Sequence, residues 1–150
     1  MELTSPAFAD GGKIPSKYTC DGTNTSPRLV ISEVPSEAKS LVLIMDDPDV
    51  PKSIRQDGTW DHWVIFNIPA TLRDISEGEE PPGTPGSGTS GNQDYFGPCP
   101  PDGEHRYFFK LYALDAELSL SEKATKQQVE SAMEGHIIEK AALMGRYERR

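Results

Sequence analysis

The stretch from Ser40 to Pro51, S-L-V-L-I-M-D-D-P-D-V-P, joins an apolar run to a turn that contains two prolines. A short, continuous apolar run is typical of a strand that is covered on both faces. Proline restricts the residue before it to extended conformations, so Asp47 and Val50 are held away from the helical region. The stretch therefore predicts a buried strand followed by a stiff turn carrying the carboxylates of Asp47 and Asp49. The alternative is a turn whose carboxylates only bind nearby backbone N–H groups.

Two further stretches alternate in the way that strands do when their faces meet different environments. In 62–68 the alternation predicts one face made of His62, Val64, Phe66 and Ile68, with Trp63, Ile65 and Asn67 on the other. In 105–114 it predicts a face made of His105, Tyr107, Phe109, Leu111 and Ala113. Shorter strands are expected at Glu2–Phe8, at Leu29–Ile31 and around Met144–Glu148.

The clearest helix signal begins at Thr125, which forms a capping box with Gln128. Apolar residues at helical spacing follow, and Gly145 is expected to end the helical region. The predicted apolar face consists of Val129, Ala132, Met133, His136 and Ile137.

Proline and glycine gather between Gly78 and Gly103, which forbids a helix there and predicts a long loop. Its aromatic residues Tyr95 and Phe96 favour an ordered loop that packs on the rest of the protein. The predicted fold class is mostly β with one or two C-terminal helices, in a single domain over residues 1–150.

The chain of 150 residues has a net charge of −9, which argues against binding to nucleic acid or to an anionic membrane surface. No apolar run approaches the ~20 residues of a membrane span, and the N-terminus lacks the pattern of an export signal. We therefore expect a cytoplasmic protein without membrane insertion. Cys20 and Cys99 are not in a CxxC pair and are expected to be reduced thiols, with a disulfide as the alternative.

Two of the three histidines, His62 and His105, each begin an alternating strand. Each could be a hydrogen-bonded core residue, or could join Asp47 in a site where a carboxylate orients or charges the ring. No HxH, HxxxH or HxD spacing supports a metal site, and no G-x-S-x-G elbow supports a serine hydrolase. The glycines at 86–91 lack the lysine of a phosphate-binding loop. No metal or cofactor is predicted.

Three segments resemble the phosphatidylethanolamine-binding protein family: DPDVP at 47–51, WDHWVIFNIP at 60–69 and GPCPPDGEHRYFFKLYALD at 97–115. The similarity is closest to the small bacterial and archaeal branch often called Raf-kinase-inhibitor-like. DGTNTSP at 21–27 and EGHIIEKAALMGRYER at 134–149 extend the resemblance over nearly the whole chain.

The resemblance implies a sandwich-like antiparallel β fold with a large central sheet, a smaller packed sheet and helices near the end of the chain. It also implies a small anion-accepting pocket. The ligand-binding residues that it implies are Asp47, His62, Pro100, His105 and Tyr107. Structural support is expected from Asp49, Pro51, Trp60 and Arg106, with Arg106 bracing the turn through Asp49.

The leading functional hypothesis is a protein that binds a small anionic or phosphorylated ligand and regulates or inhibits another protein. Two imidazoles and a tyrosine hydroxyl would supply donors, while Asp47 would orient an imidazole or receive a headgroup ammonium. One alternative is an inhibitor of a proteinase or kinase that acts through the 78–103 loop. Another is a hydrolase with His62 or His105 as general base. Trp63 and Ile65 suggest a possible homodimer, unless a second sheet covers them.

Overall fold

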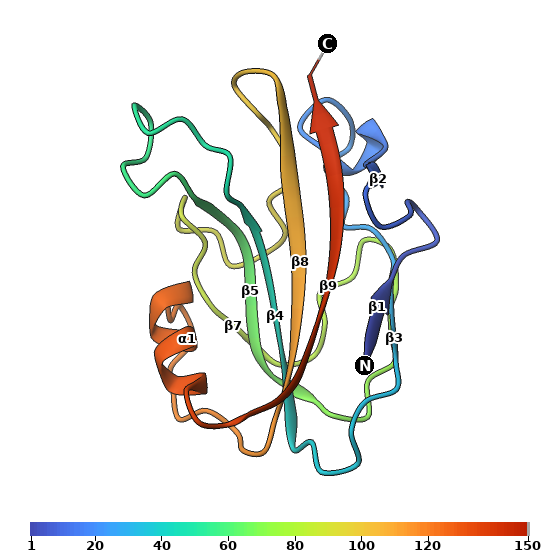
Figure 1. Cartoon of the computed structure of the whole chain (residues 1–150), viewed down its shortest axis with the longest axis vertical. Helices are drawn as coiled ribbons and strands as arrows, with labels where there is room; N and C mark the ends of the chain where they lie inside the picture. Colours follow the sequence, from blue (N-terminus) through green and yellow to red (C-terminus); the bar gives the residue numbers. More distant parts are fainter. Residues whose placement is uncertain (150) are drawn as a thin grey trace.

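The computed structural model describes residues 1–149 and contains two sheets, one α-helix and a short 3₁₀ turn at Ser16–Tyr18 (Figure 1). The helix α1 spans Lys126–Met133. The strands are β1 (Glu2–Thr4), β2 (Gly12–Lys13), β3 (Leu29–Ser32), β4 (Ser40–Asp47), β5 (Trp60–Pro69), β6 (Asp74–Ile75), β7 (Thr84–Pro85), β8 (Glu104–Leu114) and β9 (Ile137–Glu148).

The large sheet has the order β2-β9-β8-β4-β5-β7, and the small sheet has the order β1-β3-β6. Every pair is antiparallel except β2 with β9. β4 lies between β5 and β8, and every one of its residues is buried, with side chains in a core on each face of the sheet. The prediction of a strand covered on both faces is therefore confirmed, as is the mostly β fold class.

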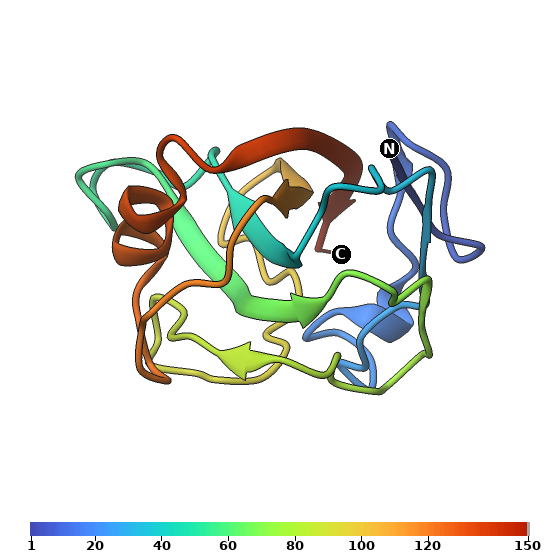
Figure 2. The ribbon, with the colours of Figure 1, turned by 90° about the horizontal axis from the view of Figure 1, so that it is seen from below.

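Two layers cover the faces of the large sheet. The small sheet packs on one face over a core that includes Leu43, Trp63 and Phe109. On the other face, α1 covers a second core that includes Val42 and Phe66. The view from below shows α1 and the strands β1 and β3 on opposite sides of the large sheet (Figure 2).

The prediction of alternating faces is correct along β8 but partly wrong along β5. Met45 of β4 pairs with Trp63, and the next residue, Asp46, pairs with Asp61. His62 is therefore an extra residue on β5 that has no pairing partner on β4. Such a bulge re-aims side chains. His62 consequently contacts Tyr107 on the small-sheet side instead of sharing a face with Val64 and Phe66.

A second irregularity in β5 lies near Asn67, which has a φ of 53°. The Asn67 amide exchanges two hydrogen bonds with the backbone of Leu118, at 2.9 and 2.7 Å. Beyond it, Ile68 packs in the same core as Trp63 and Ile65, contrary to the prediction. Trp63 and Ile65 themselves are covered within the chain, so they supply no exposed face for a dimer.

The capping box at Thr125 is confirmed, because Gln128 N–H donates to the Thr125 hydroxyl while the Gln128 side chain accepts from Thr125 N–H. The helix nevertheless ends at Met133, before Gly135, which adopts a left-handed φ of 80°. The prediction that His136 and Ile137 belong to its apolar face is therefore wrong.

Gly145 does not end a helical region; it lies within β9 and pairs with Gly12 and Tyr107. A Cβ there would lie 2.7 Å from Ile14 Cδ1, so this glycine lets another segment approach the sheet closely.

The 78–103 segment is an ordered loop packed against the large sheet, as predicted. Its short strand β7 pairs with β5, and the ring of Tyr95 meets the edge of Trp63 with centroids 5.2 Å apart. Within residues 1–149, no helix combines the length and apolar character needed to cross a membrane.

Candidate functional site

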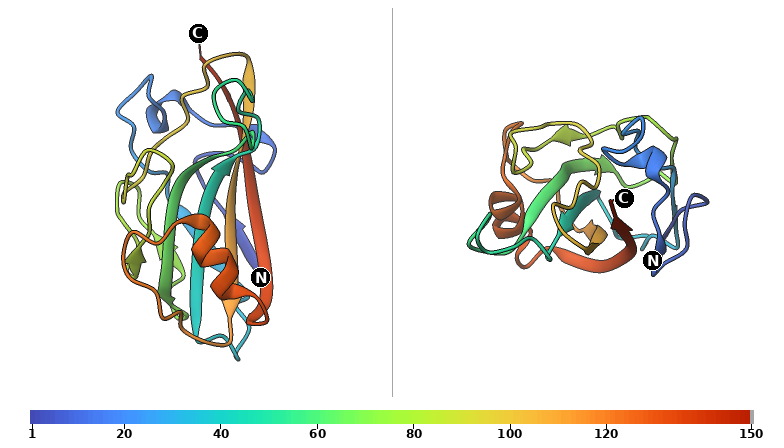
Figure 3. Two further views of the ribbon diagram at one scale, coloured as in Figure 1. Left: turned by 90° about the vertical axis from the view of Figure 1, so that its left-hand side faces the viewer. Right: turned by 90° about the horizontal axis from the view of Figure 1, so that it is seen from above.

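Three strand ends meet at one end of the large sheet: β4 ends at Asp47, β5 begins at Trp60 and β8 begins at Glu104. The loops 48–59 and 95–103 lie there, at the top of Figure 1 and of the left view in Figure 3. Between them lies a cavity of about 300 Å³. Its lining consists of Asp47, Val50, Ile54, Trp60, His62, Phe96, Cys99, Pro101 and Tyr107.

Asp47 is 2% exposed, and both of its oxygens accept hydrogen bonds. Oδ1 accepts from the backbone N–H of Asp49 at 2.8 Å, which closes the Asp-Pro turn. Oδ2 accepts from Nδ1 of His105 at 2.7 Å. Asp47 therefore both stabilises the turn and faces an imidazole, so the alternative of a carboxylate that binds only backbone N–H groups does not hold for this residue.

His105 lies behind the cavity lining, between two carboxylates. Its Nδ1 faces Asp47, and its Nε2 lies 2.9 Å from Oδ1 of Asp102. Carboxylates accept hydrogen bonds, so both ring nitrogens donate and the ring is an imidazolium. Burial opposes that charge, but the hydrogen bonds to Asp47 and Asp102 outweigh it and raise the pKa of His105. With both nitrogens occupied, His105 neutralises Asp47 and is unsuited to act as a base.

His62 has the opposite electrostatic character. Burial lowers its pKa, although a hydrogen bond to the carbonyl of Phe96 and the charge of Asp47 act in the other direction. Nδ1 lies 2.6 Å from that carbonyl oxygen and must donate to it. The neutral ring then carries its lone pair on Nε2, on a side chain that lines the cavity. His62 can therefore accept a proton or a hydrogen bond from a bound molecule.

Two buried donor groups at the cavity have no hydrogen-bond partner among residues 1–149: the Tyr107 hydroxyl and Trp60 Nε1. Tyr107 is fully buried, and its ring lies edge-on to His62 with centroids 5.4 Å apart. Burial, and then the charge of Asp47, raise the pKa of Tyr107, so its hydroxyl keeps the proton. Buried polar groups without partners are uncommon and call for an explanation, such as a ligand.

Arg106 braces the turn, as the family resemblance implied. Its guanidinium contacts both oxygens of Asp49, at 2.8 and 3.0 Å, and its backbone N–H donates to Asp49 as well. These contacts, with Arg106 as the dominant partner, lower the pKa of Asp49. The carbonyl of Pro51 accepts from the N–H of Ile54 at 2.8 Å and so shapes the loop at the cavity mouth.

The assignment of three predicted residues changes. His105, predicted to bind the ligand, does not line the cavity, and both of its ring nitrogens face aspartates. Pro100 is buried, and the adjacent Pro101 lines the cavity instead. Trp60 was predicted to be structural support but lies in the lining itself. Four further lining residues, Val50, Ile54, Phe96 and Cys99, were not predicted from the sequence, although Val50 lies within the D-P-D-V-P motif.

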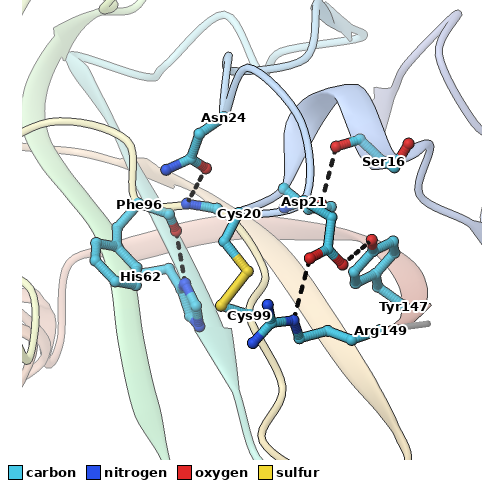
Figure 4. The surroundings of a disulfide bond; sticks show 11 residues. Ser16, Cys20, Asp21, Asn24, His62, Phe96, Cys99, Tyr147 and Arg149 are labelled. Atoms are coloured by element: carbon cyan, nitrogen blue, oxygen red, sulfur yellow. Dashed lines mark hydrogen bonds and ion pairs between the residues drawn. A yellow bond between two sulfur atoms is a disulfide. The ribbon is translucent and has the colours of Figure 1, made fainter.

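The prediction that Cys20 and Cys99 are reduced thiols is wrong, because the two form a disulfide with a Cα–Cα distance of 5.4 Å (Figure 4). The fold brings their loops together although 79 positions separate them. Cys20 N–H donates to the carbonyl of Pro98 at 3.1 Å, and Gly97 N–H donates to Asn24 Oδ1 at 3.0 Å. The spacing of the two cysteines carried no sign of this contact.

The fold and the cavity define a two-sheet β protein with a small, largely apolar cavity at the strand ends. The family model for phosphatidylethanolamine-binding protein matches residues 4–148, and the chain therefore belongs to that family.

Relatives and solved structures agree with this assignment. A UPF0098 protein of Chlamydia pneumoniae is 54% identical over 99% of both chains. A crystal structure of a putative phosphatidylethanolamine-binding protein homologue from Chlamydia trachomatis has a TM-score of 0.96 at 51% identity, covering 99% of this chain and 97% of its own. The crystal structure of E. coli YbcL, described as a new member of the mammalian family, has a TM-score of 0.88 at 28% identity, covering 99% and 98%.

Proposed function

We propose that the chain binds a small phosphorylated or otherwise anionic ligand in the cavity lined by His62 and Tyr107. The observation that carries this proposal is the pair of buried, unpartnered donors, the Tyr107 hydroxyl and Trp60 Nε1. A phosphoryl oxygen would accept from both, and hydrogen bonds to a charged acceptor are the stronger ones. The apolar side chains of Val50, Phe96 and Pro101 would contact the group to which the phosphate is attached.

The charges around the cavity are compatible with an anion. Asp47 lines the cavity, but its carboxylate is already paired with the imidazolium of His105. His62 is neutral in the free protein because burial lowers its pKa. A bound anion would favour the charged ring, so binding should be coupled to the uptake of a proton at His62.

The test uses phenyl phosphate and isothermal titration calorimetry. Replacing Tyr107 by Phe removes one oxygen and should weaken binding roughly 10- to 100-fold, as expected for a hydrogen bond to a charged group. Tyr112→Phe is the matched control, because Tyr112 lies on the same strand but contacts the core on the helix side. Millimolar phenyl phosphate that neither binds wild-type protein nor raises its melting temperature would refute the proposal.

Proton uptake is tested with phenyl sulfate, which does not itself titrate near neutral pH. Its affinity should rise as the pH falls through the pKa that His62 has in the complex. His62→Gln should bind with an affinity that is independent of pH in this range. A pH-independent affinity in the wild type would exclude His62 as the group that takes up the proton.

A hydrolase is the second candidate, because His62 keeps an unprotonated Nε2 at the cavity while His105 has no free nitrogen. Nε2 would take a proton from an attacking water. Turnover of phenyl phosphate or phenyl acetate that disappears in His62→Gln would favour this candidate. Hydrolysis of both compounds at no more than the rate without protein favours binding alone. Regulation or inhibition of a protein target by the ligand-bound chain is part of the binding proposal.

A further inference from the structure

The disulfide lies at the edge of the candidate ligand cavity. Cys99 is part of the lining, whereas Cys20 lies in an irregular loop and is exposed to solvent. Neither cysteine belongs to a strand or a helix. Figure 4 shows the disulfide beside His62 and Phe96. Exposed disulfides are among those that thiols reduce most readily, and here Cys20 supplies the exposed sulfur-bearing residue.

The segment 96–101, here called the cavity wall, supplies three lining residues: Phe96, Cys99 and Pro101. Its backbone also fixes the site, because the carbonyl of Phe96 accepts the Nδ1 proton of His62 at 2.6 Å. The position of the cavity wall therefore decides which nitrogen of His62 faces a ligand.

The cavity wall is held mainly by the loop 18–24. Tyr95, just before the wall, donates its hydroxyl proton to the carbonyl of Tyr18 at 2.7 Å. Gly97 donates to Asn24, and Pro98 accepts from the backbone of Cys20. The Cys20–Cys99 bond joins the same two segments covalently.

The loop 18–24 is in turn held to the large sheet through Asp21. The Tyr147 hydroxyl donates to Asp21 Oδ2 at 2.5 Å, and Arg149 Nε lies 3.1 Å from Oδ1. The loop thus connects the end of the sheet to the cavity wall, and the disulfide is the covalent part of that connection.

We propose that Cys20–Cys99 is a thiol–disulfide exchange site that controls the ligand cavity. In the oxidised protein the bond holds the cavity wall, and with it His62, in the binding arrangement. Reduction leaves only the hydrogen bonds between the loops, so the wall samples other positions. The apparent affinity is then reduced in proportion to the fraction of molecules that still have the binding arrangement. The effect on affinity rests on the ligand-binding function proposed above.

The reductant is a small or protein dithiol. Its thiolate attacks Sγ of Cys20, which lies on the exposed residue, and the Cys20–Cys99 bond breaks. The electron pair leaves with Sγ of Cys99, which takes up a proton. The second thiolate of the reductant then attacks the mixed disulfide, releases Cys20 as a thiolate that is protonated, and closes its own disulfide. Two electrons and two protons pass from the dithiol to the cysteine pair.

The experiment compares phenyl phosphate binding in oxidised wild type, in wild type reduced with dithiothreitol, and in Cys20→Ser. Reduction should weaken binding about 5- to 10-fold, as expected if the binding arrangement falls to a minor fraction, and reoxidation should restore it. Cys20→Ser should match the reduced protein and should not respond to dithiothreitol. Equal affinity in the oxidised and reduced protein would overturn the proposal.

A second measurement needs no ligand: the ¹⁵N chemical shifts of the His62 ring, with amide hydrogen exchange over 96–101. In the oxidised protein the shifts should report a proton fixed on Nδ1; after reduction they should report a mixture of tautomers, and the wall amides should exchange faster. Unchanged shifts and exchange rates would refute the redox control.

These two measurements separate the proposals. Failure of oxidised protein to bind phenyl phosphate would refute the proposed function, while the His62 shifts would still decide the redox control. If Cys20→Ser does not fold, reversible reduction of the wild type, with circular dichroism to confirm that it stays folded, carries the test.

Discussion

Replacing His105 by Gln leaves the carboxylate of Asp47 buried without its cationic partner. The two side chains are each 3% exposed and lie 2.7 Å apart. Removing one member of a buried ion pair typically costs about 3–5 kcal/mol, because the remaining charge is uncompensated. For a chain of this length that loss lowers the melting temperature by roughly 6–20 °C.

The matched control is His136→Gln. His136 also faces an aspartate, Asp115, at 2.8 Å, but its side chain is 47% exposed. Water screens such a pair, which is worth about 0–1 kcal/mol. The comparison keeps the residue types and a similar distance; it changes the burial and lacks a second carboxylate of the kind that Asp102 supplies to His105.

The free energy of unfolding of both variants is measured by urea denaturation, followed by fluorescence and circular dichroism. Wild type, His105→Gln, Asp47→Asn and the variant with both changes form a double-mutant cycle. The double variant should be more stable than the sum of the single effects predicts, by at least about 1 kcal/mol. The reasoning is refuted if His105→Gln costs no more than His136→Gln, or if the cycle shows no coupling.

The same pair predicts how stability depends on pH. Burial opposes the charge of His105, but Asp47 and Asp102 raise its pKa above the ordinary value of 6.5. A raised histidine pKa contributes stability that is complete below the unfolded pKa and is lost as the pH rises through the folded pKa. The difference in the free energy of unfolding between wild type and His105→Gln should therefore be largest near pH 6 and should shrink toward alkaline pH. A difference that grows with pH would contradict the assigned protonation.

Three further changes test the fold. Cys20→Ser combined with Cys99→Ser opens a crosslink between residues 79 positions apart and should cost about 4.5 kcal/mol on the loop-entropy relation, measured by urea denaturation at neutral pH. A loss below about 1 kcal/mol would show that the loops are held without the crosslink. Thr125→Ala removes the side-chain acceptor of the helix cap and should cost about 1 kcal/mol, whereas Thr125→Ser should cost little. Gly145→Ala places a methyl group against Ile14 and should cost about 1–3 kcal/mol, so a neutral effect would contradict the close packing described for β9.

Several features of this protein are determined by local sequence. The apolar run at 40–45 is long enough to require burial on both faces, and β4 occupies the middle of the sheet accordingly. The capping box at Thr125 was readable because its two hydrogen bonds join residues three positions apart. The D-P-D-V-P motif likewise implied the stiff turn that Arg106 braces through Asp49.

The resemblance to a family predicted ligand-binding roles for Asp47, His62, His105 and Tyr107, of which Asp47, His62 and Tyr107 line the cavity, but it did not distinguish the roles of the two histidines. Tertiary contacts determine the different roles of His62 and His105. His62 is turned toward the cavity by a bulge that depends on pairing with β4, and it is kept neutral by burial. His105 is charged because Asp47 and Asp102 both reach its ring.

Only the tertiary structure decided the end of the helix, the continuation of β9 through Gly145 and the pairing of Cys20 with Cys99. Each depends on a neighbour that is distant in the sequence: Ile137, just beyond the helix, pairs with Leu114 of β8, Gly145 is packed by Ile14, and the two cysteines meet across 79 positions. Periodicity and spacing report interactions within a few residues along the chain. Contacts made by separate loops and strands follow from the packing of the whole molecule, which is why the local pattern left them undetermined.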